Sequence, residues 1–318
     1  MHRSPTQRLL QSAVPLLSLL FLSAAVEAAP PKVVVDIKPI HSLVSGVMAG
    51  VGQPELLIRG ADSPHNFTLR PSDARRLNNA DLIFWVGESL EASLSSILDT
   101  IEGRVVELLA RQGIESPPLR KAGIWQKSPF DNTTEERHEP LSDHDHPHGN
   151  PHIWLSPPNA TVMVTHIEHE LKTIDPGNSK HYMRNADRLR QRIQVLDGLL
   201  EKRLSTVRTQ PYIVFHDAYQ TFEAHYGLNA VGSVTLTPDR MPGARRIHLL
   251  RNAMDELNIR CLFSEPQFQP RLVTVLTEGT TIEHGTLDPL GAGLVPGAEA
   301  YFQLMQNMAN SLVDCLER

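Results

Sequence analysis

Short apolar runs alternate with amphipathic segments along the first third of the chain. Runs of strand length occupy residues 33–37, 56–58, 82–86 and 105–108. Segments with the three-and-four spacing of a helix occupy residues 42–48, 71–79 and 90–98. Strands that alternate with helices in this way predict a parallel sheet covered by helices.

The same alternation returns in the last third of the chain. Strands are expected at residues 212–215, 230–234 and 261–263. Helices are expected at residues 219–226, 245–257, 271–278 and 300–316. The chain has 318 residues, which exceeds the size at which one hydrophobic core usually stops growing, so we expect a second α/β lobe.

A long amphipathic segment separates the two series. After a helix expected at 157–174, apolar residues recur at helical spacing over residues 179–207. A helix of about 29 residues would be roughly 43 Å long, enough to run along both lobes. The expected fold is therefore α/β, with two lobes of parallel sheet joined by a long rigid connecting helix. The predicted organisation is a signal peptide at 1–28, an N-terminal lobe at 29–178, the connecting helix at 179–208 and a C-terminal lobe at 209–318.

The N-terminus has the order of a secretory signal peptide. Arg3 and Arg8 precede an apolar run at 9–22, and small residues follow before Ala29. This run is shorter than the roughly 20 residues that span a bilayer, so we expect cleavage rather than anchoring. Neither cysteine lies beside the cleavage site, where a lipoprotein would need one. The expected location of the mature chain is the periplasm.

The composition excludes nucleic acid as a partner and draws attention to histidine. A net charge of −6 provides no basic field for a phosphate backbone, whereas 15 histidines are many for this length. Four of them lie in a His-rich loop predicted at 131–151, namely His138, His144, His146 and His148. Such a tract either gathers metal weakly and passes it on or is a solvated linker, and the sequence leaves both readings open.

Four candidate metal ligands lie just beyond expected strands or at loop tips: His65, His152, His216 and Asp288. Ligand sites in open α/β sheets lie outside the carboxyl ends of the strands. We therefore expect two ligands from each lobe to meet in an interlobe cleft. Three imidazoles and one carboxylate suit tetrahedral Zn²⁺, although spacing alone does not distinguish this site from four unrelated loop residues.

The chain has only two cysteines, Cys261 and Cys315. In an oxidising compartment an even pair predicts a disulfide, and two separate buried thiols are the alternative. A bond between them would tie the last helix to the second lobe.

A series of short motifs resembles the ZnuA-type zinc receptors of the metal-binding ABC solute-receptor group. The motifs lie at residues 38–43 (KPIHSL), 63–65 (SPH), 69–73 (LRPSD), 80–82 (ADL), 85–87 (WVG), 152–157 (HIWLSP), 215–219 (FHDAY), 265–268 (EPQF) and 285–291 (GTLDPLG). They extend over nearly all of the mature chain and are specific in combination and in order. The resemblance implies two α/β lobes joined by a rigid helix, and a disulfide between the two cysteines.

The resemblance also implies a set of ligands and partners. It assigns His65, His152 and His216 to zinc, with Asp288 or a water completing the coordination. Some zinc members carry a glutamate just before the first histidine, where this chain has Pro64, which favours direct binding by Asp288. The implied partner is a zinc ABC permease with its cytoplasmic ATPase. A periplasmic zinc chaperone is a further candidate, and the receptor is expected to be a monomer and not an enzyme.

Two other functions are weighed against zinc capture. Manganese receptors of the same group generally place a carboxylate where this chain has His216, in keeping with the preference of manganese for oxygen. A secreted zinc hydrolase would need an open coordination position and a general base nearby. Zinc as transported cargo is the preferred hypothesis.

Overall fold

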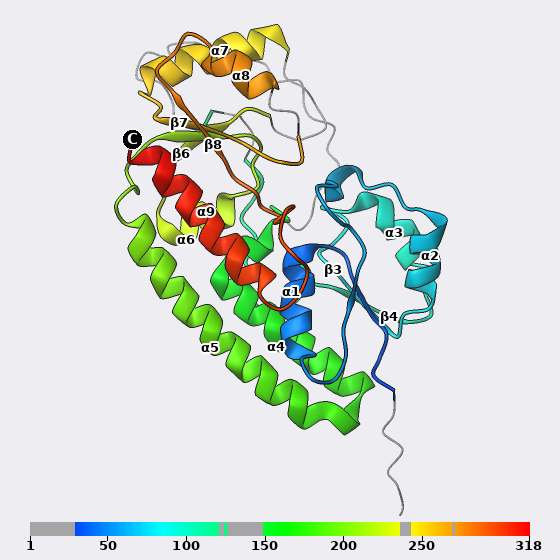
Figure 1. The fold of residues 1–318 in the computed structure, drawn as a ribbon. Coiled ribbons are helices and arrows are strands. Elements are labelled where there is room, and N and C mark those ends of the chain that lie inside the picture. The colour runs from blue at the N-terminus through cyan, green and yellow to red at the C-terminus, as the bar shows by residue number, and fades with distance from the viewer. Residues whose placement is uncertain (1–28, 121–123, 126–148, 236–242, 269–270) are drawn as a thin grey trace, which may run out of the picture.

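The computed structural model describes residues 29–120, 124–125, 149–235, 243–268 and 271–318, which form two α/β lobes (Figure 1). The expected signal peptide at 1–28 and the four loop histidines, His138, His144, His146 and His148, lie outside the described residues. Within the described ranges, none of the helices combines the length and the apolar character needed to cross a membrane.

The first lobe contains a four-stranded parallel sheet with the strand order β2-β1-β3-β4. Its strands are β1 (Val33–Val35), β2 (Glu55–Leu56), β3 (Leu82–Trp85) and β4 (Arg104–Glu107). Its helices are α1 (Lys38–Val47), α2 (Pro71–Asn78) and α3 (Ala92–Leu98). The helix α1 lies between this sheet and the rest of the molecule, whereas α2 and α3 lie at the outer side (Figure 1).

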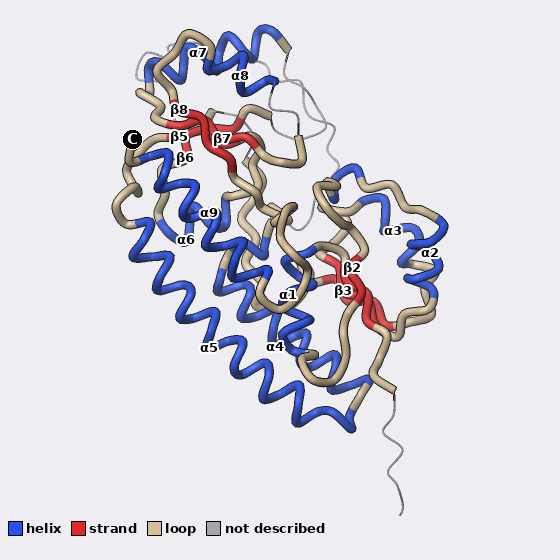
Figure 2. Tube along the Cα trace, viewed as in Figure 1, coloured by secondary structure: helices blue, strands red, loops and turns tan. Residues whose placement is uncertain are grey.

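The second lobe repeats the arrangement with the parallel order β6-β5-β7-β8. Its strands are β5 (Tyr212–Val214), β6 (Ala230–Ser233), β7 (Cys261–Ser264) and β8 (Glu283–Thr286). Its helices are α6 (Gln220–Tyr226), α7 (Ala244–Glu256), α8 (Arg271–Thr277) and α9 (Ala300–Leu316). Figure 2 shows the two sheets as separate blocks, each with helices on both sides. The expected fold class is confirmed.

Two long helices connect the lobes. The helix α4 (Pro157–Ile174) is followed, after a short turn, by α5 (Ser179–Leu204), which has 26 residues and packs on α1, α4 and α9. It runs along both lobes in Figure 1. It ends four residues before the expected boundary at 208 because Ser205 and Thr206 form a turn, in keeping with the preference of such residues for turns.

One apolar core extends through both lobes. It joins Val35 of β1, Leu196 of α5, Tyr212 of β5 and Leu312 of α9, all of which are buried. A second, smaller core fills the space between the second sheet and the helices α7 and α8. The two lobes are therefore packed against each other rather than linked by an exposed hinge.

The strand β8 was not expected from the sequence. Its residues Glu283 to Thr286 contain no apolar run, and three of the four are exposed. It forms the edge of the second sheet by pairing in parallel with β7. Hydrogen bonding to a buried neighbour, rather than hydrophobic burial, places it there.

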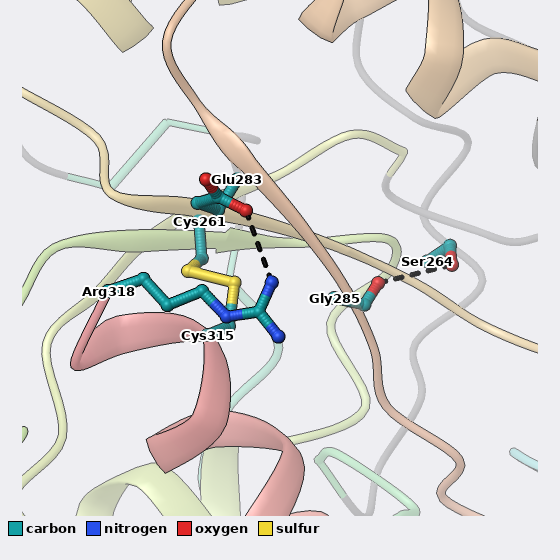
Figure 3. The surroundings of a disulfide bond; sticks show 6 residues. All are labelled: Cys261, Ser264, Glu283, Gly285, Cys315 and Arg318. Atoms are coloured by element: carbon teal, nitrogen blue, oxygen red, sulfur yellow. Dashed lines mark hydrogen bonds and ion pairs between the residues drawn. A yellow bond between two sulfur atoms is a disulfide. The ribbon is translucent and has the colours of Figure 1, made fainter.

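The predicted disulfide between Cys261 and Cys315 is present. Figure 3 shows that it joins β7 to the last turn of α9, beside an ion pair in which Arg318 lies 3.4 Å from Glu283. The hydroxyl of Ser264, further along β7, donates to the carbonyl of Gly285 on β8 at 3.3 Å. Because α9 also packs on α1 and α5, the bond fixes the second sheet to helices that contact the first lobe.

Asp36 and Glu91 form a buried carboxyl pair at the carboxyl ends of the first sheet. Asp36 accepts hydrogen bonds at 2.6 Å from the backbone N–H groups of Ile37 and Val86, and Glu91 accepts one from Gly87. Burial raises the pKa of Asp36 to about 6, although these hydrogen bonds and Glu91 oppose it. Burial, and then the charge of Asp36, raises the pKa of Glu91 well above its ordinary value. Burial therefore favours the protonated form of both carboxyl groups.

We expect the contribution of the Asp36–Glu91 pair to the free energy of unfolding of the metal-free chain to fall as the pH rises above about 4. An unfolded carboxyl ionises near that pH, whereas folded Asp36 keeps its proton until about pH 6, so the folded state binds more protons in this window. Glu91→Gln, whose amide would donate to Asp36, should be more stable than wild type at pH 8 and lose that advantage at pH 4. Urea unfolding in a chelator at both pH values measures this, with the exposed Glu88→Gln as control. An equal pH dependence in E91Q and wild type would contradict the prediction.

Candidate metal centre

Three histidines reach the same point from different parts of the fold. His65 lies in the short 3₁₀ helix Pro64–Asn66 of the first lobe, and Pro64 begins that helix. His152 precedes a second 3₁₀ helix, Ile153–Leu155, which leads into α4. His216 comes two residues after the end of β5 in the second lobe. The carboxyl end of the second sheet and two tight turns therefore position the three rings.

The three rings converge through their Nε2 atoms. The Nε2 atom of His152 lies 3.3 Å from Nε2 of His65 and 3.3 Å from Nε2 of His216. All the ligand atoms of this group lie within 4.8 Å of one another. Donors at 2.0–2.1 Å from a tetrahedral zinc ion are about 3.3–3.4 Å apart. The spacing is therefore that of three ligands on one such ion.

Two hydrogen bonds orient the buried rings. The Nδ1 atom of His216 donates to Glu265 at 2.6 Å, and Nδ1 of His152 donates to the side-chain oxygen of Asn150 at 2.7 Å. The amide nitrogen of Asn150 in turn donates to the carbonyl of Asp217 at 2.8 Å, which fixes which end of the amide faces the ring. With a proton on each Nδ1, both Nε2 lone pairs point into the cluster.

Burial keeps two rings of the cluster, His65 and His152, uncharged without a bound cation. Burial lowers the pKa of His65 to about 3, and His216 adds to the effect. Burial also lowers the pKa of His152 well below its ordinary value, with further contributions from the two neighbouring imidazoles. Both rings are therefore neutral at physiological pH, which is the form that binds a metal.

The histidines open onto a small cavity between the lobes. Its volume is about 10 Å³, and Ser63, Trp154, Gln267 and Phe268 complete much of its lining. A space of this size suits one ion or one water molecule and no larger ligand. The cavity is therefore shaped for an inorganic ion.

Asp288 lies apart from the three imidazoles. Among the described residues, no carboxylate belongs to the histidine group. The carboxylate of Asp288 instead accepts from the backbone N–H groups of Leu290, Gly291 and Ala292 at 2.6–3.1 Å, and from the amide of Gln267 at 2.9 Å. The sequence Asp-Pro-Leu-Gly thus forms a turn closed by its own aspartate, as short acidic side chains often do.

The Asp288 turn also fastens the two lobes together. Lys38 of the first lobe donates to the carbonyls of Gly291 and Ala292. The indole N–H of Trp154 donates to the carbonyl of Pro289 at 2.7 Å. The turn therefore contributes to the closed arrangement around the cavity.

Comparison with known families agrees with this site. The sequence profile of the ZnuA family, described as "Zinc-uptake complex component A periplasmic", matches residues 33–315. The chain belongs to this zinc-uptake component A family.

Relatives in the zinc-uptake component A family match the chain over nearly its full length. The high-affinity zinc uptake system protein ZnuA of Brucella suis is 39% identical over 306 residues, which cover 90% of this chain and 92% of that protein. A crystal structure of ZnuA superimposes with a TM-score of 0.74 at 21% identity, covering 90% of this chain and 99% of that one. The protein FpvC of Pseudomonas aeruginosa, solved with Mn²⁺, has a TM-score of 0.73 at 20% identity, covering 91% and 98%.

Membership of the zinc-uptake component A family does not itself reveal the residues that support the histidines. Glu265 is the first residue of the motif at 265–268, which by itself assigns it no contact, and the structure places it against His216. No role was predicted for Asn150 or Gln267, although Gln267 lies in the motif at 265–268 and Asn150 lies two residues before the motif at 152–157. Asparagine two residues before a histidine is a weak signal for the Nδ1 contact, and the motif EPQF includes Gln267 without indicating what its side chain contacts.

Proposed function

We propose that this chain captures one Zn²⁺ ion in the periplasm and delivers it to an ABC-type zinc import permease with a cytoplasmic ATPase. The observation that carries the proposal is the 3.3 Å spacing of the Nε2 atoms of His65, His152 and His216. The name of the Brucella relative, which states high-affinity zinc uptake, supports the same cargo. Zinc is a substrate here, because a receptor must release what it binds.

Several features favour zinc over manganese. The shared fold does not select the metal, since the similar FpvC was solved with Mn²⁺. The ligand atoms do select it, because three imidazole nitrogens suit zinc whereas manganese prefers oxygen. Within the described ranges, the cluster includes no carboxylate. We therefore expect zinc to bind far more tightly than manganese.

The cavity argues against a zinc hydrolase. A hydrolase needs a coordination position open to an organic substrate and a free general base. The cavity of about 10 Å³ has no room for such a substrate. Glu265, a carboxylate that lines it, already accepts a hydrogen bond from Nδ1 of His216. Capture of the ion, rather than chemistry on a second molecule, fits the site.

The described residues on both sides of segment 126–148 are attached to the fold, and those that follow it contact the site. Before it, the backbone N–H of Trp125 donates to Val231 on β6 at 2.8 Å. After it, Asn150 contacts His152 directly. These attachments support a role in which His138, His144, His146 and His148 bind zinc weakly and pass it to the cavity. The same proposal includes a cleaved signal peptide, a monomeric receptor and a periplasmic zinc chaperone as a further partner.

Metal titration of the chain from residue 29 to 318 tests the function. After removal of metal with a chelator, calorimetry should show one tight zinc-binding event and manganese binding weaker by at least about a hundredfold. The zinc-loaded chain should stimulate the ATPase of its permease in proteoliposomes. Displacement of zinc by equimolar manganese would favour a manganese receptor, and zinc-dependent cleavage of ester substrates would favour a hydrolase.

A further inference from the structure

Gln267 links the metal cavity to the Asp288 turn. It follows β7, two residues after Glu265, and its side chain lines the cavity. Its Nε2 atom donates to the carboxylate of Asp288 at 2.9 Å. The nitrogen end of the amide is thus bound to the turn, and the oxygen end is not.

The Asp288 turn fixes the orientation of that amide. An ionised carboxylate accepts hydrogen bonds and donates none, and Asp288 is held in place by three backbone N–H groups. The NH₂ end of Gln267 must therefore face Asp288, which leaves the carbonyl oxygen at the opposite end of the amide. This Oε1 atom is buried and accepts no hydrogen bond from any described residue.

A buried acceptor without a donor is unfavourable, so a partner for Oε1 is required. The first lobe presents a second unsatisfied group to the same cavity, because the buried hydroxyl of Ser63 has no partner within the described ranges. A water molecule needs two or more polar partners to be held in a cavity. Gln267, Ser63 and a bound cation would together supply them.

We infer that Gln267 presents its amide oxygen to a water molecule that occupies the fourth position of the bound zinc, and that Asp288 acts by orienting this amide. The inference rests on the proposed function, because it concerns the same ion. Three histidines supply three of the four ligands that zinc takes, and the fourth, a water, donates a hydrogen bond to Oε1. Gln267 is a positioning residue in this arrangement. Asp288 supports it by accepting the hydrogen bond from its Nε2 atom.

The arrangement also contributes to metal selectivity. A neutral amide stabilises the bound water without adding a hard anionic oxygen to the site, which disfavours manganese. A glutamate at this position would be repelled by the carboxylate of Asp288 and would turn toward the cation. The zinc site would then gain the type of ligand that manganese prefers.

Substitution of Gln267 by methionine tests the inference, because methionine has a similar volume but no carbonyl. In the chain from 29 to 318, we expect Gln267→Met to raise the zinc Kd about tenfold, as loss of a supporting hydrogen bond usually does. The visible spectrum of the Co²⁺-loaded protein, which reports the ligands and their geometry, should shift in the same variant. Gln191→Met on the exposed face of α5 is the matched control and should leave both measurements unchanged.

A second variant, Gln267→Glu, keeps the shape of the side chain and should narrow the difference between zinc and manganese affinities at least about tenfold. A Co²⁺ spectrum of Q267M identical to that of wild type would overturn the inference, even if the affinity fell, because the effect would then come from packing. An unchanged zinc Kd in Q267M would overturn it as well. If wild type itself binds no zinc tightly, the proposed function fails, whereas tight binding that is insensitive to Gln267 rejects only this inference.

Discussion

A chain in which His65, His152 and His216 are all replaced by alanine is expected to lose its tight zinc-binding event. The three Nε2 atoms lie 3.3 Å apart in successive pairs around one point, and structural zinc sites of this kind bind with roughly 10–16 kcal/mol. Removing all three donors should therefore weaken binding by at least about a thousandfold. Calorimetric titration of the metal-free protein would show only weak binding in the variant.

The matched control replaces three exposed histidines that lie elsewhere: His169, His181 and His248. This control should bind one zinc ion with the affinity of wild type. A further variant that lacks residues 131–148 separates the central cluster from the His-rich loop. Tight binding that survives in the triple cluster variant but disappears with the loop would place the high-affinity site in the loop and contradict our assignment.

Removal of the disulfide is the second change with a large expected effect. Cys261 and Cys315 are separated by 54 positions, and cross-linking a loop of that length stabilises a protein by about 4 kcal/mol in the chain-entropy model. The double variant Cys261→Ser with Cys315→Ser should therefore unfold on the order of 10 °C below wild type. Thermal unfolding followed by circular dichroism in the metal-free state measures the difference.

A reducing agent supplies the control for the disulfide prediction. Wild type treated with dithiothreitol should unfold at the temperature of the double serine variant, and the variant itself should not respond. If reduction leaves the unfolding temperature of wild type unchanged, the bond does not stabilise the folded state. If the untreated variant is as stable as wild type, the entropic estimate is wrong for this chain.

The sequence predicted the helices well where local signals mark their ends. The bounds expected for α4 and α9, residues 157–174 and 300–316, agree with the structure. In α4, Ser156 accepts from Asn159 and a proline follows it directly, which is a strong start signal. The edge strand β8 was missed because exposed residues such as Glu283 and His284 give no apolar pattern.

The candidate site was predicted unevenly for a different reason. Periodicity cannot show that the Nε2 atoms of His65 and His152, 87 positions apart in the chain, lie 3.3 Å from each other. That the ligands meet was expected from the carboxyl ends of the predicted strands, and the resemblance to zinc receptors assigned them to one ion. The resemblance also favoured Asp288 as a ligand. In the structure, its carboxylate oxygens accept hydrogen bonds from nearby backbone N–H groups of the same turn. Gln267 and Asp288 each lie in one of the quoted motifs, but the contact between them depends on loop geometry that neither motif reveals.

The apolar core shared by the two lobes affects how an empty receptor would differ from a loaded one. Moving the lobes apart would expose buried side chains such as Leu43 of α1, Leu196 of α5 and Leu312 of α9. Exposing about 400 Å² of apolar surface costs on the order of 10 kcal/mol, far more than thermal motion supplies. The outline of the molecule should therefore change little with its cargo. A permease that distinguishes the two states would have to sense the few side chains at the mouth of the cavity, at close range, rather than an open or closed shape.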